Sequence, residues 1–251
     1  MKSLKENFKK AHILIIGSGI IGKFNALELS ELGFQITIVD PAQHQNSSNA
    51  ALGLLMGNMY QKRRGRSWDL RKQSIELWPQ WITFLQKFNC ELNIEKPLIQ
   101  LTTDEEKFKK LEKFVYENND QNLRILERDS IFIKNIIKAF QATNIKGMIS
   151  FKDGRINPFS LLQTLDQYLK HKKVNYLREE IIKIRKSNWL MKGKISKKWF
   201  GIRSRPDGEP SPIMKNLEDG LIICSGFYKN GILLAPACSK WVANEIKNYF
   251  S

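Results

Sequence analysis

The first clear hydrophobic pattern is a short apolar run, Ile13–Ile16, directly before a cluster of glycines. A continuous aliphatic run favours a parallel strand that is buried on both faces. After the glycines, apolar residues recur at helical spacing from Ile21 to Leu32, and Gly33 stands where a left-handed residue ends a helix. A second β-rich run, Ile36–Val39, follows. The pattern predicts a strand, a helix and a second parallel strand.

Helical spacing also predicts a long helix over residues 66–88. The face that we expect to be buried consists of Leu70, Leu77, Trp81, Leu85 and Phe88. Pro79 lacks a backbone N–H, so we expect it to bend or restart this helix. Two further helices are predicted from their start signals, a capping box at residues 103–106 and Asn157 before Pro158.

Composition then narrows the class of protein. The chain has 251 residues, of which 42% are apolar, and this suits one large globular domain or two small ones. No stretch approaches the roughly 18 apolar residues of a membrane span, and the polar residues 1–10 show no secretory signal, so we expect a cytoplasmic protein. Three widely spaced cysteines give neither a redox pair nor zinc-ligand spacing, and we assign no metal site.

The net charge of +16 at pH 7 raises the question of a nucleic-acid partner. Lysine outnumbers arginine, and isoleucine and asparagine are abundant, as expected when A/T-rich codons inflate several residue types together. The basic stretches at residues 62–72 and 183–205 show neither a helix of base-reading residues nor aromatics interleaved along a groove. We interpret them as solvated faces and expect no nucleic-acid partner.

The glycines fit the G-x-G-x-x-G pattern of dinucleotide-binding folds. Gly17 allows the tight turn, Gly19 lets the backbone approach a pyrophosphate, and Gly22 permits close packing of helix on strand. Phosphate charge would rest on free N–H groups at the helix N-terminus. Asp40 ends the second strand, where an acid can bind both ribose hydroxyls and would repel a 2′-phosphate. The pattern predicts a Rossmann-like α/β domain that binds FAD or NAD.

Four segments follow the motifs of one known family. The first is the G-x-G-x-x-G fingerprint of residues 17–22 together with the small residues 46–55 that follow it. The others are Asp153-Gly154-Arg155-Ile156-Asn157-Pro158, residues 199–208, and residues 225–236. Together they resemble the D-amino-acid oxidase family of FAD-dependent amine oxidases, and within it the glycine oxidases of thiamine biosynthesis. The last segment resembles the loop that closes over the flavin in that family.

The resemblance implies which residues hold FAD. Ile20 and Ile21 would touch the pyrophosphate, and Asp40 with Pro41 the adenosine ribose. The remaining implied contacts are Ser47 and Ser48 with phosphate or ribityl oxygens, Leu52, Gly53 and Leu54 with the isoalloxazine, Val174 with adenine, and Phe227, Tyr228, Asn230, Gly231, Ile232 and Leu233 with the flavin ring.

The resemblance also implies a fold and a reaction. The fold is a glutathione-reductase-like FAD-binding domain made of residues 1–85 and 148–251, with residues 86–147 as a reduced substrate or cap region. The reaction is hydride transfer from the α-carbon of an amino acid or amine to the flavin, with O2 as the final acceptor. Arg203 would bind the substrate carboxylate, with Lys229 adding positive charge beside it. A homo-oligomer is compatible with the family.

Two departures from the family leave other interpretations open. The chain has Phe227 and Lys229 where the family has His and Arg, and it runs from residue 184 into residue 199 without the strands and the antiparallel sheet found there in the family. A second interpretation is therefore a flavin-binding remnant without turnover. A third, resting on the fingerprint alone, is an NAD-binding domain.

Overall fold

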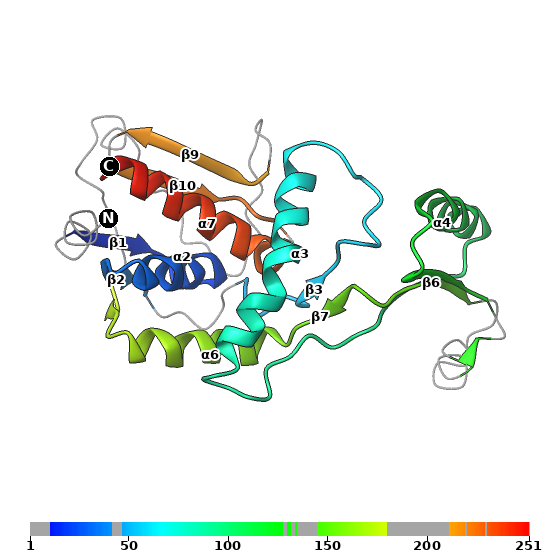
Figure 1. The fold of residues 1–251 in the computed structure, drawn as a ribbon, viewed down its shortest axis with the longest axis horizontal. Helices are drawn as coiled ribbons and strands as arrows, with labels where there is room; N and C mark the ends of the chain where they lie inside the picture. Colours follow the sequence, from blue (N-terminus) through cyan, green and yellow to red (C-terminus); the bar gives the residue numbers. More distant parts are fainter. Residues whose placement is uncertain are drawn as a thin grey trace.

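Two groups of elements, joined by a pair of short strands, make up the structure (Figure 1). The computed structural model describes residues 11–41, 47–127, 130–131, 134, 145–179, 211–218, 220–228 and 230–250. The strands are β1 (His12–Ile16), β2 (Gln35–Val39), β3 (Leu54–Leu55), β4 (Leu98–Thr102), β5 (Leu123–Leu126), β6 (Lys146–Ser150), β7 (Gly154–Arg155), β8 (Asn175–Leu177), β9 (Ile213–Glu218) and β10 (Leu221–Ser225). The helices are α2 (Ile20–Glu31), α3 (Arg66–Leu85), α4 (Glu105–Asn118), α6 (Pro158–His171) and α7 (Gly231–Tyr249). No described helix combines the length and apolarity that a membrane span requires.

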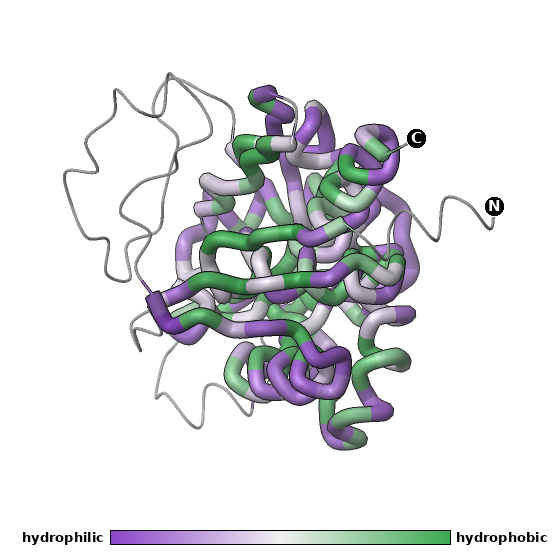
Figure 2. The backbone as a smooth tube through the Cα atoms, turned by 90° about the vertical axis from the view of Figure 1, so that its left-hand side faces the viewer, coloured by the Kyte–Doolittle hydropathy of each residue, from purple (hydrophilic) through white to green (hydrophobic). Residues whose placement is uncertain are grey.

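The larger group, which we call the nucleotide lobe, is built on a parallel sheet of order β1-β2-β8. Helix α2 connects β1 to β2, as the sequence predicts, and Gly33 beyond it has the expected positive φ of 94°. Helices α6 and α7 both pack against α2, and α3 packs against α7. In Figure 2 the hydrophobic stretches gather toward the middle and the hydrophilic ones toward the periphery.

One prediction about β1 is wrong. The strand pairs with β2 as expected, but Leu14 and Ile16 are 57% and 52% exposed, whereas Ile15 alone is buried. Within the described ranges no strand pairs with the other edge of β1. Leu14 and Ile16 point to the same face of the sheet and line a cavity, so no further layer among the described residues covers them. An aliphatic run indicates a strand, but it does not show whether both faces of that strand are covered by other elements.

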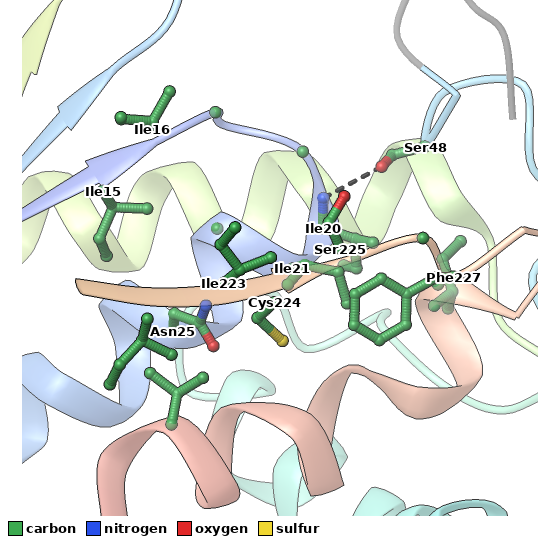
Figure 3. Close-up of a pocket in the computed structure, with 18 of the residues that line it drawn as sticks. Ile15, Ile16, Ile20, Ile21, Asn25, Ser48, Ile223, Cys224, Ser225 and Phe227 are labelled. Carbon is green, nitrogen blue, oxygen red and sulfur yellow. Dashed lines mark hydrogen bonds between the residues drawn. The ribbon is translucent and has the colours of Figure 1, made fainter. Parts of the chain in front are cut away.

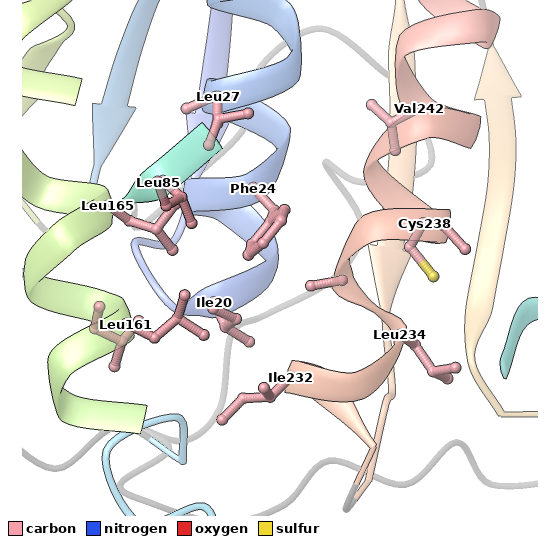
Figure 4. Close-up of a cluster of buried hydrophobic side chains, with 14 of the residues drawn as sticks. Ile20, Phe24, Leu27, Leu85, Leu161, Leu165, Ile232, Leu234, Cys238 and Val242 are labelled. Carbon is pink, nitrogen blue, oxygen red and sulfur yellow. The ribbon is translucent and has the colours of Figure 1, made fainter. Parts of the chain in front are cut away.

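The core of the nucleotide lobe lies between α2, α3, α6 and α7 (Figure 4). Phe24 of α2 is fully buried and meets Trp78 of α3 edge to face, with ring centroids 5.5 Å apart. Leu165 of α6 and Val242 of α7 close the cluster from the other two helices. Truncating a fully buried aromatic such as Phe24 costs about 3–5 kcal/mol, so this cluster holds the four helices together.

Helix α3 is correctly predicted, but its buried face and its response to Pro79 are not. The helix runs unbroken through Pro79, which is exposed. Its buried residues are Leu70, Arg71, Ser74, Trp78, Ile82 and Leu85. Leu77 and Trp81 of the predicted face are only half-buried. Two polar residues, Arg71 and Ser74, lie on the buried face. A prediction from apolar residues alone leaves them out, so the predicted buried face is displaced around the helix axis from the observed one.

Ser74 and Trp78 of α3 support α7 around Pro236. The N–H of Ala237 donates to Ser74 Oγ at 3.1 Å, and Trp78 Nε1 donates to the carbonyl of Leu233, also at 3.1 Å. A proline inside a helix disturbs the hydrogen-bond ladder around it. The α3 side chains therefore satisfy backbone groups next to Pro236 and fix the first turns of α7.

The smaller group, which we call the small lobe, is an antiparallel sheet of order β4-β6-β5 covered by α4. It has its own apolar cluster, formed by Met59, Leu111, Leu123 and Met148. Helix α4 is predicted correctly, but its cap is Asp104, whose carboxylate accepts the N–H of Lys107 at 3.0 Å. The cap of α6 is Asn157, as predicted, and it accepts the N–H groups of residues 159 and 160.

The two lobes are joined where β3 pairs with β7. Beside this pair Asp153, only 1% exposed, accepts three consecutive backbone N–H groups, those of Gly57, Asn58 and Met59, at 2.7–2.8 Å. A buried carboxylate with several backbone donors is fully satisfied and resists movement. We call this arrangement the Asp153 clasp.

Candidate functional site

A cavity of about 1330 Å³ runs between β1, β10 and the starts of α2 and α7. Ligand pockets are typically about 300–1,000 Å³, so this one has room for a large ligand. Most of the predicted cofactor residues line it, namely Gly17, Gly19, Ile20, Ile21, Gly22, Ser47, Ser48, Leu52, Gly53, Leu54, Phe227, Tyr228, Asn230, Gly231, Ile232 and Leu233. Figure 3 shows β1, α2 and β10 contributing side chains to the same space.

At one end of the cavity, which we call the phosphate end, glycines form the turn between β1 and α2. Gly17 has φ of 100°, and its N–H donates to the carbonyl of Val39 at 2.9 Å, so the turn is held to β2. A Cβ on Gly22 would lie 1.9 Å from the carbonyl oxygen of Gly17. Both glycines are therefore required by the backbone, one for conformation and the other for close packing.

Helix α2 begins at this turn, and no side chain of its N-cap residue caps the backbone N–H groups of its first turn. Its N-cap, Gly19, has no side chain to cap the helix, and the first turn holds no acidic residue. The hydroxyl of Ser48 accepts the N–H of Ile20 at 3.0 Å (Figure 3), and a Cβ on Gly19 would lie 3.3 Å from that hydroxyl. A helix N-terminus without acidic side chains attracts anions such as a pyrophosphate.

Asp40 lies beside the same turn. Its carboxylate accepts the N–H of Ser18 at 2.7 Å, and its own N–H donates to the carbonyl of Leu177 at 3.0 Å. Asp40 thus sits where the carboxyl ends of β2 and β8 meet the glycine turn, the position at which parallel sheets bind ligands. Asp40 and Pro41 border this turn without lining the cavity itself.

One further predicted residue is not brought to the cavity, and two others lie outside the described residues. Val174 comes directly before β8, at its amino end, and lines a separate hollow of about 520 Å³. Its N–H donates to the carbonyl of Leu169 at the end of α6. Arg203 and Lys229, the predicted carboxylate-binding residues, lie outside the described residues.

Another part of the cavity, which we call the ring end, is lined by Gly53 and the start of α7, and it adjoins the start of α2, because a Cβ on Gly231 would lie 3.5 Å from Ile20 Cγ2. Gly53 has φ of 74°, and a Cβ there would lie 1.9 Å from the carbonyl oxygen of Ile156. Phe227 is buried, whereas Tyr228 is half-exposed and has a left-handed φ of 51°. Helix α7 begins at Gly231 with no acidic residue in its first turn and no side-chain cap.

Sequence reasoning missed Arg71, which also lines the ring end. It is 3% exposed, donates to the carbonyl of Met56, and donates from Nη2 to Asn230 Oδ1 at 3.1 Å. Burial lowers the pKa of its guanidinium, while the hydroxyl of Tyr60 and the carboxylate of Asp153 act in the opposite direction. One signal in the sequence could have indicated it. Arg71, Ser74 and Trp78 are spaced three and four residues apart, so they share one face of the predicted helix.

Asn25 is a second residue that the pattern did not single out. It lies on the cavity side of α2, is 8% exposed, and its Oδ1 is buried without a hydrogen-bond partner (Figure 3). Leaving a buried polar atom unsatisfied costs about 1–3 kcal/mol. The atom itself is covered by protein, so it is an unsatisfied acceptor in the wall of the cavity and not one that faces the cavity space.

Taken together, these features fit a long anionic ligand with a ring system at one end. Two helix N-termini without acidic first turns, those of α2 and α7, face one cavity. The walls of the cavity are mostly aliphatic, and Asp40 lies beside the glycine turn. The donor set matches a dinucleotide such as FAD better than a metal ion, and the described residues hold no cluster of three or more metal-ligating side chains.

Comparison with protein families gives one match. The model of the family described as DAO, FAD dependent oxidoreductase, matches residues 12–193 and 170–245, which is most of the chain. Comparison with curated proteins gives no match.

Solved structures supply similar folds. A glycine oxidase from Bacillus cereus ATCC 14579 has a TM-score of 0.73 at 17% identity, covering 96% of this chain and 98% of that one. A glycine oxidase from Geobacillus kaustophilus has a TM-score of 0.57 at 21% identity, covering 70% and 49%. An L-amino acid deaminase from Proteus myxofaciens has a TM-score of 0.56 at 18% identity, covering 72% and 41%. This chain spans less than half of the latter two, and at these identities the likeness concerns the fold.

Proposed function

The chain belongs to the DAO family of FAD-dependent oxidoreductases, and from this premise we propose that it is an amino-acid or amine oxidase resembling glycine oxidase. Its cofactor is FAD, so the interpretation as an NAD-binding domain is set aside. When bound, FAD supplies the acceptor for a hydride from the substrate α-carbon, with O2 as the proposed final oxidant. A role in thiamine biosynthesis stays a prediction from the resemblance.

The observation that carries the proposal is one cavity faced by two helix N-termini, those of α2 and α7, neither of which has an acidic residue in its first turn. The free N–H groups of α2 and the hydroxyl of Ser48 would hold the pyrophosphate, and Asp40 the ribose. The segment around Gly53 and the start of α7 would border the flavin ring. We retain residues 86–147 as the proposed cap region, with the two flanking segments as the FAD-binding domain.

The chain's own contribution to the reaction is binding and orientation. A neutral amine needs no side-chain base to lose a hydride, so the main requirement is to hold the α-carbon against the ring. The proposed carboxylate anchors are Arg203 and Lys229, because a cation fixes one end of an amino acid while the other reacts.

The test begins with the absorption spectrum of protein reconstituted with FAD and freed of excess cofactor. A retained flavin absorbs visible light, and protein that stays colourless would contradict the proposal. Hydrogen peroxide is then measured after adding glycine, sarcosine or a D-amino acid in air. Arg203→Lys is the matched variant, since it keeps the charge but loses the planar fork, and we expect its KM to rise more than its kcat falls.

A second candidate function, flavin binding without turnover, is favoured by one observation. Tyr228, beside the start of α7 that would border the flavin ring, lines the cavity and is 47% exposed, so water reaches the ring end. Oxidases depend on a site that excludes water from the reacting atoms. Yellow protein that gives no peroxide with any of these substrates would select this function, and peroxide formation would exclude it.

A further inference from the structure

We propose that Arg71 is the residue that makes the ring end of the cavity electropositive and thereby favours the negative charge that the flavin gains on two-electron reduction. Arg71 acts as a positioning and electrostatic residue, through its own charge and through its hold on Asn230. The inference rests on the proposed function, because it concerns the same cavity. It adds a residue that neither the fingerprint nor the family motifs single out.

The charge of Arg71 is buried without a direct ion pair among the described residues, and the carboxylate of Asp153 acts on it only through space. Its side chain is 3% exposed, and its Nε is buried without a hydrogen-bond partner. The ion pairs formed among the described residues do not include Arg71. Its hydrogen-bond partners, the Met56 carbonyl, the Asn230 amide oxygen and the Tyr60 hydroxyl, are all neutral groups. An arginine stays charged under these conditions, so the site carries a positive charge that an anion would offset.

Arg71 also changes the start of α7. An asparagine at an N-cap ordinarily accepts a first-turn N–H with its side-chain oxygen. Here Asn230 is the N-cap but makes no such bond, because its Oδ1 accepts from Arg71 Nη2 at 3.1 Å. The first turn of α7, residues 231–233, lines the cavity without that cap. The helix dipole and the guanidinium therefore point positive charge at the same end.

The position of the guanidinium is fixed on several sides. Its carbon lies 3.7 Å from the centroid of the Tyr60 ring, and that ring stacks on Trp68 at 6.3 Å. Tyr60 directly follows the three residues that the Asp153 clasp holds. Arg71 thus bridges the segment ending at Met56 and the loop before α7, the two segments that are proposed to border the flavin ring. A fixed charge in a water-poor site acts strongly on its neighbours.

The test uses sulfite, a probe that needs no turnover. Sulfite donates a sulfur electron pair to form a covalent bond with N5 of the oxidised flavin, so the ring system gains negative charge without any other oxidant or reductant. The sulfite dissociation constant therefore reports how well the site tolerates that charge. It is measured by loss of visible flavin absorbance in the FAD-loaded full chain, together with the midpoint potential of the bound flavin.

Three variants separate charge from shape. Arg71→Met removes the charge and roughly keeps the length, and Arg71→Lys keeps the charge without the fork. Lys72→Met is the control, because it removes one positive charge from the adjacent, exposed position of α3. We expect Arg71→Met to raise the sulfite dissociation constant about tenfold or more, and a tenfold change in a two-electron equilibrium corresponds to about 30 mV. Arg71→Lys should recover most of the loss, and Lys72→Met should match the parent protein.

A second route covers the case in which Arg71→Met does not fold. Asn230→Asp leaves the arginine in place but sets a carboxylate against it, so it should also raise the sulfite dissociation constant. Parent-like sulfite binding in the folded variants would overturn the inference. So would a change confined to the KM of an amino acid, which would assign Arg71 to the substrate carboxylate. Failure of the proposed function looks different, because it appears in the parent protein as absent flavin or absent peroxide.

Discussion

The two ends of the cavity are built in different ways. The phosphate end comes mainly from one continuous stretch, in which β1, the glycine turn and the start of α2 follow each other, with Asp40 and Ser48 contributed from further along the chain. The ring end is assembled from β3, the second turn of α3, the Asp153 clasp and the loop before α7. Local backbone geometry therefore determines the first end, and long-range packing determines the second. The two should respond differently to substitution.

The largest effect is expected at the phosphate end. Gly22→Ala places a methyl group 1.9 Å from the carbonyl oxygen of Gly17, a backbone atom that cannot move alone. We expect a loss of about 3 kcal/mol or more of stability and loss of FAD binding, measured by thermal unfolding and flavin retention.

The matched control is Gly33→Ala at the other end of α2. Gly33 also has positive φ, but a Cβ there meets nothing within 4 Å, so only backbone strain of about 1 kcal/mol remains. If the two variants lost equal stability, the rigid turn at the phosphate end would be disproved.

The next effect is expected at the ring end. Asp153→Asn replaces an acceptor of three backbone N–H groups by an amide that carries its own donors. We expect a loss of about 2–3 kcal/mol, measured by urea unfolding, and weaker flavin retention because Tyr60 and Arg71 lose their support. Glu112→Gln, an exposed substitution of the same type, should change stability little. Flavin retention equal to the parent protein would show that the clasp does not reach the cavity.

A smaller effect separates two neighbouring serines. Ser48→Ala removes the hydroxyl that accepts the Ile20 N–H, a single buried hydrogen bond worth about 1 kcal/mol, so FAD affinity should fall about fivefold. Ser47 is exposed and should matter less. Titration of the apoprotein with FAD measures both. Equal losses would mean that the phosphate end draws on more of the 47–50 turn than the Ile20 contact indicates.

The smallest effect is expected on β1. Leu14→Ser changes a side chain that is 57% exposed, so stability should change by about 0.5 kcal/mol or less. Ile15→Ala, in the same strand but buried, should cost about 2–4 kcal/mol. Thermal unfolding of the two variants compares them directly. A large loss for Leu14→Ser would show that this side of β1 is covered.

What the sequence could predict follows the same division. The glycine turn, Asp40 and the strand-helix-strand order were predictable because each role depends on neighbours within one stretch. The role of Arg71 was not predictable, because its partners Met56 and Asn230 lie 15 and 159 positions away and the sequence of α3 does not indicate them. The burial of β1 was mispredicted because the hydrophobic pattern does not reveal that one face of the strand, that of Leu14 and Ile16, is uncovered. Val174, taken from the resemblance alone, lies before β8, away from the cavity.

The Asp153 clasp has a consequence for how such a protein can change over time. It ties residue 153 to residues 57–59, and β3 pairs with β7 beside it. After α3, which belongs to the nucleotide lobe, residues 96–154 form an insertion whose two ends are held together by the backbone pair of Glu95 and Arg155. Such an insertion can grow, shrink or be exchanged while its entry and exit keep their spacing. The small lobe is therefore the part of this architecture that can change most in length and sequence. Such changes leave the cavity in the nucleotide lobe unaltered.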